Sequence, residues 1–403
     1  MRIQTELPRT VSELTACPCC GSGVLRPFYA VNQIPCHSVL LMDSFEQAVN
    51  YPRANLKLSF CESCGFIMNT IFDVSCNDYS QSYEETQHFS SRFNSFAGRL
   101  VRRLIDRYDL RNKSVLEIGC GKGEFLGLLC ELGNNRGVGI DPGCRPERFP
   151  PKWASRIEVI QELYSEEWTH LTADVICCRH TLEHIGPVRE LLQTIRSSIS
   201  DHDDTLVFFE VPDIRIVLEE ARFWDIYYEH CSYFSLGSLA RLFRSCQFEI
   251  IELERDFDDQ YALIVARPSA SATQPQLPEE QDLDELARLV EQFQLQSRLA
   301  IQNWQDRLRE YHVDGKAVSA WGAGSKCVSF LTTTGLADEV AFATDINPHK
   351  QGRFLPATGH PVTSPADLAE QRPDVVVVMN PIYLTEIRAE LESMNLRPEL
   401  IAV

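Results

Sequence analysis

Residues 223–236, FWDIYYEHCSYFSL, are unusually rich in side chains that can exchange protons or donate hydrogen bonds. They include Tyr227, Tyr228, Glu229, His230 and Tyr233. Each such group that is buried must find a hydrogen-bond partner or cost free energy, so an ordinary core segment carries few of them. The stretch therefore has the composition of a reaction pocket.

A second set of ionisable side chains follows an apolar run in DVICCRHTLEHI, where we expect a strand over residues 175–178. The polar residues after that run are Arg179, His180, Glu183 and His184. The tyrosine-rich stretch likewise follows the apolar run of TLVFFEVPD. In a doubly wound sheet, ligands bind beyond the carboxyl ends of the strands. A single histidine is more often a core group, whereas His180, His184 and His230 at strand ends of one sheet indicate a site.

A glycine-rich turn in KSVLEIGCGKGEFLGLL could hold a ligand. A short strand over residues 115–118 enters a turn that contains Gly119, Gly121 and Gly123, and a helix follows. The next strand ends in VGIDP, which places Asp141 directly after it. This order of elements opens a nucleotide-binding α/β unit.

An acidic residue, Glu117, precedes the first glycine and separates this turn from a dinucleotide fold, which would place phosphates on the helix N-terminus. It favours S-adenosylmethionine, which carries cationic groups and no pyrophosphate. Glu117 and the backbone of Gly119 and Gly121 can meet the methionine end, and Asp141 can accept hydrogen bonds from both ribose hydroxyls. Two further residues assigned to this ligand lie at another strand end: Arg179 and His180. The whole pattern resembles the first signature of class I methyltransferases.

These groups need a scaffold, and the sequence predicts one. Phe96, Leu100, Leu104 and Tyr108 recur every four residues and predict an amphipathic helix before the glycine turn. Apolar strands then alternate with helical stretches as far as YALIVARP. Such alternation predicts a mostly parallel, doubly wound α/β sheet.

Fifteen cysteines are present, and four of them are spaced like metal ligands. CPCC supplies Cys17 and Cys20, and CESC supplies Cys61 and Cys64. Two C-x2-C pairs can give four thiolates to a tetrahedral zinc ion, which would close a region that has little core of its own. A closed four-sulfur shell leaves no position for substrate, so we expect a structural site. The alternatives are unrelated reduced thiols, or a ligand set that uses other nearby residues: Cys19, Cys36 and His37.

The end of the chain repeats the pattern of strand, glycine turn and helix. A linker rich in proline, serine and acidic residues comes first, followed by a long helix over about 283–311 that we expect to act as a spacer. AVSAWGAGSK then opens a second α/β unit, with Asp345 after its next strand. Its basic residues, in an otherwise acidic chain, are Lys326, His349, Lys350 and Arg353. They predict either a grip on a diphosphate or nucleotide, or a solvated basic loop.

The composition limits the partners. With 38 basic and 57 acidic side chains, the net charge is −19, which argues against nucleic acid as a partner. Charged residues make up 24% and hydrophobic residues 44%, and no apolar run is long enough to span a membrane. The first residues carry no apolar signal core. We therefore expect a cytoplasmic protein with reduced thiols, acting as a monomer or homodimer.

Two stretches carry a more specific resemblance. Residues 227–235, YYEHCSYFS, and residues 345–353, DINPHKQGR, occur together with the paired cysteine knuckles and WGAGSK. In this combination the chain is similar to the three-domain sugar C-methyltransferases, which methylate nucleotide-linked 4-keto-deoxysugars in antibiotic pathways. The resemblance implies a zinc-binding domain over 1–78, an S-adenosylmethionine-dependent methyltransferase domain over 79–267, a linker and spacer helix over 268–312, and a Rossmann-like domain over 313–403.

The resemblance also implies roles for single residues. Tyr227, Glu229 and His230 match the family's catalytic Tyr-x-Glu-His, and His184 matches its histidine after the fourth strand. Methylation of carbon needs a base that removes a proton next to a ketone and donors that stabilise the enolate oxygen. His230 is the expected base because its free pKa lies near neutrality. Tyr227 and His184 would donate to the enolate, and Glu229 or Glu183 would fix the tautomer of His230.

Some positions depart from the family, and other functions stay open. Tyr228 stands where the family usually has histidine, and in DYSQSYEE either Tyr79 or Tyr83 could face the site, with Tyr83 taken as the further catalytic residue. One alternative is an O- or N-methyltransferase for another acceptor. The other is a non-catalytic protein that binds S-adenosylmethionine or a nucleotide sugar, but a sensor needs no base, and the density of ionisable groups argues against it.

Overall fold

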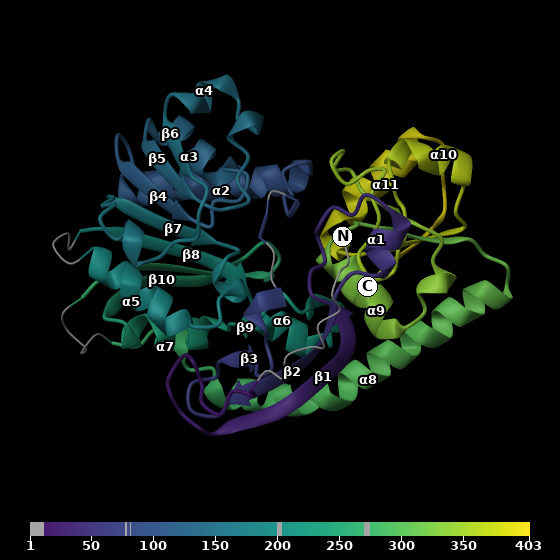
Figure 1. Ribbon diagram of the computed structural model, residues 1–403, viewed down its shortest axis with the longest axis horizontal. Coiled ribbons are helices and arrows are strands. Elements are labelled where there is room, and N and C mark those ends of the chain that lie inside the picture. The colour runs from purple at the N-terminus through teal and green to yellow at the C-terminus, as the bar shows by residue number, and fades with distance from the viewer. Residues whose placement is uncertain (1–11, 77–78, 81, 200–203, 270–274) are drawn as a thin grey trace, which may run out of the picture.

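The computed structural model describes residues 12–76, 79–80, 82–199, 204–269 and 275–403. In this part of the chain the strands form three sheets, which belong to an N-terminal module, a central α/β unit and a C-terminal α/β unit. Figure 1 shows the central sheet on one side, the C-terminal unit on the other, and the long helix α8 along the edge of the molecule below. Residues 77–78, at an expected domain boundary, and 270–274 of the expected linker lie outside the described residues.

The N-terminal sheet has the order β1-β2-β3-β9 with antiparallel neighbours. The elements of this module are β1 (Leu25–Pro35), α1 (Phe45–Val49), β2 (Arg53–Cys61), β3 (Ile67–Asn69), the short turn η1 (Val74–Cys76) and β9 (Ser232–Tyr233). Strand β9 comes from the tyrosine-rich stretch, and it pairs Tyr233 with Ile67 and Ser232 with Met68. The N-terminal module therefore holds one end of the stretch that is expected to react.

The central sheet has the order β10-β11-β8-β7-β4-β5-β6, parallel from β8 to β6 and antiparallel at the β10 edge. Its strands are β4 (Ser114–Ile118), β5 (Arg136–Ile140), β6 (Ile157–Ile160), β7 (Val175–Arg179), β8 (Leu206–Pro212), β10 (Phe248–Asp256) and β11 (Tyr261–Pro268). Its helices are α2 (Ser91–Tyr108), α3 (Glu124–Gly133), α4 (Pro151–Ala154), α5 (Val188–Ser198), α6 (Ile214–Glu219) and α7 (Leu236–Ser245), with short turns η2 (Pro146–Arg148), η3 (Glu166–Trp168), η4 (Leu182–His184) and η5 (Phe223–Asp225). The expected doubly wound α/β fold is confirmed.

Helix α2 shows how apolar spacing builds the core of this unit. Ser90 caps its start by accepting a hydrogen bond from the Phe93 N–H at 3.2 Å. Phe96, Leu100 and Leu104 are buried, as their four-residue spacing predicts, in a core that continues into α3. Removing these side chains from water holds α2 against the sheet, close to the glycine turn that precedes α3.

The C-terminal sheet is parallel, in the order β14-β13-β12-β15-β16. Its elements are β12 (Val318–Trp321), α9 (Ser325–Thr334), η7 (Ala337–Glu339), β13 (Ala343–Thr344), β14 (Val362–Thr363), η8 (Pro365–Asp367), α10 (Leu368–Gln371), β15 (Val375–Val378), η9 (Pro381–Tyr383), α11 (Leu384–Ser393) and β16 (Glu399–Ala402). Asp345, after β13, accepts hydrogen bonds from the Ala323 N–H at 2.9 Å and the Asn347 N–H at 2.8 Å. The aspartate thus fixes the glycine turn after β12.

Helix α8 (Leu283–Val313), preceded by the short turn η6 (Pro278–Glu280), connects the units. Its first half buries Leu286, Val290 and Phe293 against the N-terminal module and α6. Its second half buries Leu308 and Tyr311 against the C-terminal unit. Besides connecting the units, α8 therefore packs apolar side chains on both ends of the molecule. None of the described helices is at once long and apolar enough to cross a membrane.

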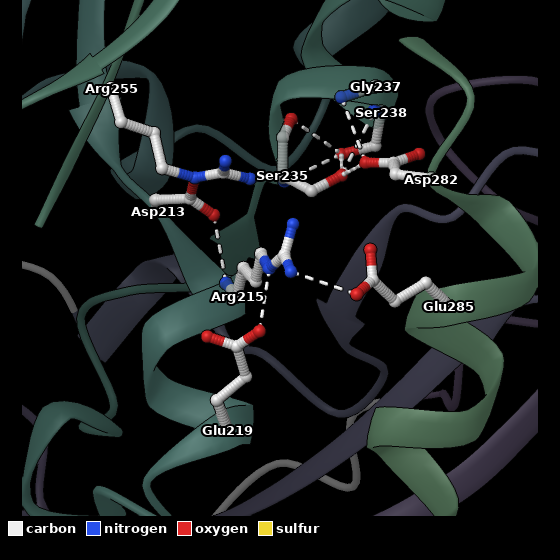
Figure 2. Close-up of polar contacts among 9 residues, drawn as sticks. All are labelled: Asp213, Arg215, Glu219, Ser235, Gly237, Ser238, Arg255, Asp282 and Glu285. Carbon is white, nitrogen blue, oxygen red and sulfur yellow. Dashed lines mark hydrogen bonds and ion pairs between the residues drawn. The ribbon is translucent and has the colours of Figure 1, made fainter. Parts of the chain in front are cut away.

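The start of α8 is anchored beside the tyrosine-rich stretch, as Figure 2 shows. Asp282 Oδ2 accepts hydrogen bonds from the Ser235 hydroxyl at 2.5 Å and from the Gly237 N–H at 2.9 Å, in the first turn of α7. A Cβ atom at Gly237 would lie 2.0 Å from Asp282, so this contact requires glycine. Arg215 of α6 donates to Glu285 of α8 at 2.8 Å. Helix α8 thereby holds the second end of the stretch.

Candidate active site

A cavity of about 2230 Å³ opens at the carboxyl ends of β4, β7, β8 and β12. It is lined by the segment of residues 82–90, here called the strap, by the glycine turn after β4, by the loop after β7, by residues from 225–233 and by the turn after β12. Strand carboxyl ends are the usual ligand sites of α/β sheets. The glycine turns of the central and C-terminal units therefore face one space.

The glycine turn after β4 lets a ligand come close to the backbone. Gly119, Gly121 and Gly123 have φ values of 68°, 53° and 75°, in the left-handed region that favours glycine. A Cβ atom at Gly119 would lie 2.0 Å from Thr181 Oγ1, and one at Gly121 would lie 2.8 Å from Glu85 Oε1. A larger residue at either position would displace the side chain of Thr181 or Glu85.

Asp141, directly after β5, holds the far side of this turn. Its Oδ2 accepts from the Gly121 N–H at 2.9 Å, and its Oδ1 accepts from the Gly143 N–H at 2.6 Å. Burial raises the pKa of Asp141, and the two N–H donors oppose that rise. Each carboxylate oxygen can accept more than one hydrogen bond, so Asp141 remains able to accept from a ligand diol.

Glu117, in β4, lacks a full set of partners. The residue is 2% exposed, and its Oε2 has no hydrogen-bond partner among the described residues. Burial raises the pKa of Glu117 to about 8. A buried carboxyl in this state fits a ligand that brings hydrogen-bond donors or positive charge. S-adenosylmethionine brings both, and its ribose diol suits Asp141, so the residues present fit this group.

Arg179 and His180 line the cavity, but a residue that sequence reasoning missed holds their polar ends. Glu210 of β8 accepts from Arg179 Nε at 3.1 Å and from Arg179 Nη2 at 2.6 Å, and its Oε1 lies 2.8 Å from His180 Nε2. Burial would raise the pKa of Glu210, but Arg179 and His180 outweigh it and hold the pKa at about 2. The signal for Glu210 was a lone acid inside the apolar run FFEVP.

The side chains expected to react meet in the wall of the cavity. The rings of His184 and His230 have centroids 4.7 Å apart and are nearly perpendicular. The Tyr227 ring lies 4.2 Å from the His230 ring, centroid to centroid. The Tyr79 hydroxyl lies 3.1 Å from His184 Nδ1, and the Tyr83 ring centroid lies 6.4 Å from that of His184. Both tyrosines that the sequence left open thus line the cavity.

Both histidines are neutral at neutral pH. Burial lowers the pKa of His184 to about 4. Burial also lowers the pKa of His230 well below its usual value, and the nearby His184 adds a smaller effect in the same direction. The free value near neutrality, on which the sequence argument relied, does not hold in the fold, because burial penalises the charged imidazolium. A neutral ring still has the lone pair that a base requires.

Glu229 does not contact His230 in the expected way. Its carboxylate lies 2.8 Å from His37 Nδ1, accepts from the Ser38 hydroxyl, and accepts from the Ser325 hydroxyl at 3.3 Å. Although burial opposes ionisation, His37 and Ser38 hold the pKa of Glu229 below its usual value. Glu229 therefore joins the N-terminal module, the reacting stretch and the C-terminal unit. No local signal marked His37 as its partner, since 192 positions separate the two.

Tyr228, at the position that departs from the family, turns away from the cavity. Its side chain is 1% exposed, and its hydroxyl accepts a hydrogen bond from the Asp73 N–H at 2.8 Å. The Phe72 ring packs beside it with centroids 5.3 Å apart. Tyr228 stabilises the contact with the N-terminal module.

The four basic residues of the C-terminal unit separate into two pairs. Lys326, which is paired with Asp225, and Lys350, whose Nζ lies 3.3 Å from Asp345, line the cavity. The remaining two residues, His349 and Arg353, are not among its lining residues. The His349 ring packs against Phe89, and Arg353 forms an ion pair with Asp43.

The cysteines of the two C-x2-C pairs come together in the N-terminal module. The four sulfurs of Cys17, Cys20, Cys61 and Cys64 lie within 4.8 Å of one another. The Cys17 and Cys64 sulfurs lie 3.7 Å apart, and the Cys20 and Cys61 sulfurs lie 3.5 Å apart. A zinc ion bound tetrahedrally by thiolates at 2.3 Å requires sulfurs about 3.8 Å apart, so this group fits zinc. His37, considered as an alternative ligand, instead contacts Glu229.

Comparisons with known proteins agree with this arrangement. Residues 88–253 match the family model described as a methyltransferase domain, and residues 266–398 match the one described as a C-methyltransferase C-terminal domain. C-methyltransferase NovU from Streptomyces niveus is 29% identical over 315 residues, which cover 72% of this chain and 71% of that protein.

Two solved structures are more distant matches. One is the riboflavin-derivative dimethyltransferase RosA from Streptomyces davawensis, with a TM-score of 0.35 and 19% identity, covering 44% of this chain and 56% of that one. The other is 1,6-didemethyltoxoflavin-N1-methyltransferase from Burkholderia thailandensis, with a TM-score of 0.33 and 18% identity, covering 44% and 80%.

The family matches join the two α/β units in one chain, and the four-cysteine group precedes them. The glycine turn, Glu117 and Asp141 lie inside the first matched region, and Lys326 and Lys350 lie inside the second. The chain is therefore an S-adenosylmethionine-dependent methyltransferase that carries a C-methyltransferase C-terminal domain.

Proposed function

We propose that the protein methylates a carbon atom next to a ketone, on a nucleotide-linked keto-deoxysugar. The observation that carries the proposal is the pair of neutral histidines, flanked by tyrosines, in the same cavity as the glycine turn. Oxygen and nitrogen atoms are already nucleophilic, whereas carbon must first lose a proton. Several buried proton acceptors and donors in one wall therefore favour carbon. The relative from Streptomyces niveus is itself a C-methyltransferase.

His230 is proposed as the base. A ring nitrogen of the neutral imidazole takes the proton from the carbon next to the ketone, and the electron pair left behind forms the enolate. Tyr227, whose ring lies 4.2 Å from that of His230, can donate a hydrogen bond to the enolate oxygen. His184 and Tyr83 are proposed as further catalytic groups. Glu229 is assigned to positioning, since its contacts hold the reacting stretch in place.

The donor site is proposed to consist of Glu117, Gly119, Gly121 and Asp141. S-adenosylmethionine, when bound, supplies an electrophilic methyl group on a cationic sulfur. Asp141 would accept from the ribose hydroxyls, and Glu117 would accept from the methionine end. Two further residues, Arg179 and His180, would form the cavity floor, positioned through Glu210.

The acceptor's nucleotide is proposed to bind at the turn after β12. Lys326 and Lys350 line the cavity there, and a diphosphate would share them with Asp225 and Asp345. For the other two basic residues, His349 and Arg353, we propose no direct contact with the acceptor, because neither lines the cavity. The four cysteines are proposed to hold a structural zinc, and the cytoplasm is the proposed compartment.

The proposed function predicts a product with a new carbon–carbon bond. The protein should be incubated with S-adenosylmethionine labelled with ¹³C in its methyl group and with nucleotide-linked 4-keto-deoxysugars. We expect one acceptor to gain a methyl group, which nuclear magnetic resonance shows coupled to a ring carbon. A label on oxygen or nitrogen would instead establish an O- or N-methyltransferase. Without transfer to any keto sugar, the proposed acceptor class would be wrong.

A second prediction concerns the donor. Asp141→Ala should weaken binding of S-adenosylmethionine by about 1 to 3 kcal/mol, because ribose hydroxyls would lose a buried acceptor. Isothermal calorimetry measures this directly. Asp345→Ala is a matched control, since Asp345 also follows a strand and accepts two backbone N–H groups, at 2.9 and 2.8 Å, but in the other unit. Equal losses in both variants would count against the assigned donor site.

A further inference from the structure

Glu183 is a cavity-lining carboxyl group that has no role in the mechanism above. It lies in η4, directly after β7, and is 2% exposed. Its Oε2 has no hydrogen-bond partner among the described residues. A buried polar atom without a hydrogen-bond partner lowers the stability of the fold. At the wall of a ligand cavity, such an atom points to a contact that the ligand completes.

No lysine or arginine side chain of the described residues forms an ion pair with the Glu183 carboxyl group. The guanidinium of Arg179 is engaged by Glu210 through contacts of 3.1 and 2.6 Å, and it stacks 4.0 Å from the centre of the Phe125 ring. Nδ1 of His180 is 3.8 Å from Glu183 Oε1, beyond hydrogen-bond distance. An ionised Glu183 would therefore be a buried charge without a paired cation.

The surroundings keep the proton on Glu183 at neutral pH. Burial raises the pKa of Glu183 to about 8 and the charge of Glu210 adds to the rise, whereas a hydrogen bond from the backbone N–H of Glu183 and the charge of Arg179 oppose it. The other titratable groups around it, from the loop after β7, the reacting stretch and the segment before the strap, are Cys178, His180, His184, Tyr227, His230, Cys231 and Tyr79. Below pH of about 8 the group is therefore a neutral carboxylic acid, which can donate a hydrogen bond.

The position of Glu183 places this donor where the reaction is proposed to occur. A carboxyl oxygen of Glu183 and ring nitrogens of His184 and His230 lie within 4.8 Å of one another. The backbone adds rigidity, because the Cys231 N–H donates to the Glu183 carbonyl oxygen at 3.0 Å. Glu183 and the proposed base thus stay side by side.

We propose that Glu183 is a further catalytic residue, a neutral acid that donates a hydrogen bond to the enolate oxygen. This inference rests on the proposed function. The carbon-bound proton goes to His230, the electron pair goes into the enolate, and Glu183 retains its own proton throughout. Buried carboxylic acids that stay neutral are effective donors to an oxyanion, because the site excludes water and the donor is already oriented.

Two variants separate a neutral donor from a charged carboxylate. The probe is a thymidine-diphosphate-linked 4-keto-6-deoxyglucose, with S-adenosylmethionine at saturation. Glu183→Ala removes the donor and should lower kcat by roughly 10²- to 10³-fold. Glu183→Gln keeps an N–H donor of the same length without a titrating proton, and kcat should stay within about 10-fold of wild type. Circular dichroism and donor binding show whether each variant is folded.

The pH profile gives a readout that a structural role would not change. Because the protonated form of Glu183 is the active one, wild-type kcat should fall as pH rises through about 8. Glu183→Gln should retain its kcat through that range. Glu117 has a pKa of about 8 as well. Because Glu117 is unchanged in Glu183→Gln, a fall in kcat that persists in this variant would be assigned to Glu117 and would contradict the role of Glu183.

Infrared spectroscopy tests the protonation state without any acceptor. At neutral pH the wild type should show the carbonyl band of a protonated carboxyl group that Glu183→Gln lacks. The inference is overturned if that band is absent, if the Gln variant is as inactive as the Ala variant, or if both variants match wild type. A wild type that methylates no carbon overturns the proposed function itself, whereas an active wild type with one of these results overturns only the role of Glu183.

Discussion

The His230→Asn protein should bind S-adenosylmethionine normally and yet lose methyl transfer by roughly 10²- to 10⁴-fold, the usual contribution of a positioned base. Its asparagine can still fill space and donate a hydrogen bond, but it cannot take a proton. In heavy water the wild type should exchange the hydrogen next to the ketone, and the variant should not. Loss of exchange together with methylation places the defect in proton abstraction, before methyl transfer.

A matched control is His170→Asn. His170 is exposed, lies outside the cavity lining, and has its Nδ1 2.8 Å from the Glu167 carbonyl oxygen. This variant should exchange and methylate like wild type. If His230→Asn also methylates at close to the wild-type rate, another group abstracts the proton, and His184 and Tyr83 are the next candidates.

Burial of His230 has two opposite consequences for this role. Its lowered pKa ensures that the ring is neutral and ready to accept a proton across the neutral range. The same low pKa makes the ring a weaker base, so the enolate must be stabilised while the proton leaves. Tyr227, whose ring lies 4.2 Å from that of His230, is proposed as one such donor. Tyr227→Phe should accordingly cost less than His230→Asn, because it removes one donor of several.

The parts of the fold that were predictable from sequence depend on local pattern. Strand, glycine turn and helix follow one another from β4 to α3, and Asp141 directly follows the next strand, β5, within the same unit. Such a unit is fixed by its own turn residues, since Gly119 and Gly121 need left-handed backbone that other residues avoid. The span of α8 followed in the same way from the spacing of its apolar residues.

The parts that were not predictable depend on contacts between distant segments. Strand β9 joins β3, so a two-residue piece of the reacting stretch completes the N-terminal sheet. Glu229 pairs with His37, which lies 192 positions away, and Arg353 pairs with Asp43 instead of lining the cavity. Nothing in the sequence around His37 or Asp43 predicts these pairings. Only packing of the three units decides which charged groups face ligand and which face each other.

Removal of one zinc ligand should have the largest effect on stability. We expect Cys61→Ser to lose the single bound zinc that elemental analysis should find in the wild type, and to unfold at a much lower temperature in calorimetry. A structural zinc can contribute on the order of 10 kcal/mol to folding of the module that binds it. Cys61 ends β2, the strand that pairs with β3, so the effect should extend through β3 to β9 and the reacting stretch.

The two C-x2-C segments, residues 17–20 and 61–64, also contact the central unit directly. We therefore expect loss of zinc to lower both stability and activity. Arg189 of α5 donates to the Cys19 carbonyl oxygen at 2.7 Å, and Arg241 of α7 donates to that of Cys64 at 2.8 Å. Cys76→Ala is the matched control, because it removes a thiol from η1 of the same module but leaves the four-sulfur group and both carbonyls. It should keep its zinc and most of its activity. A metal-free wild type that is fully folded and active would contradict the assignment, since the module would then be held by packing alone.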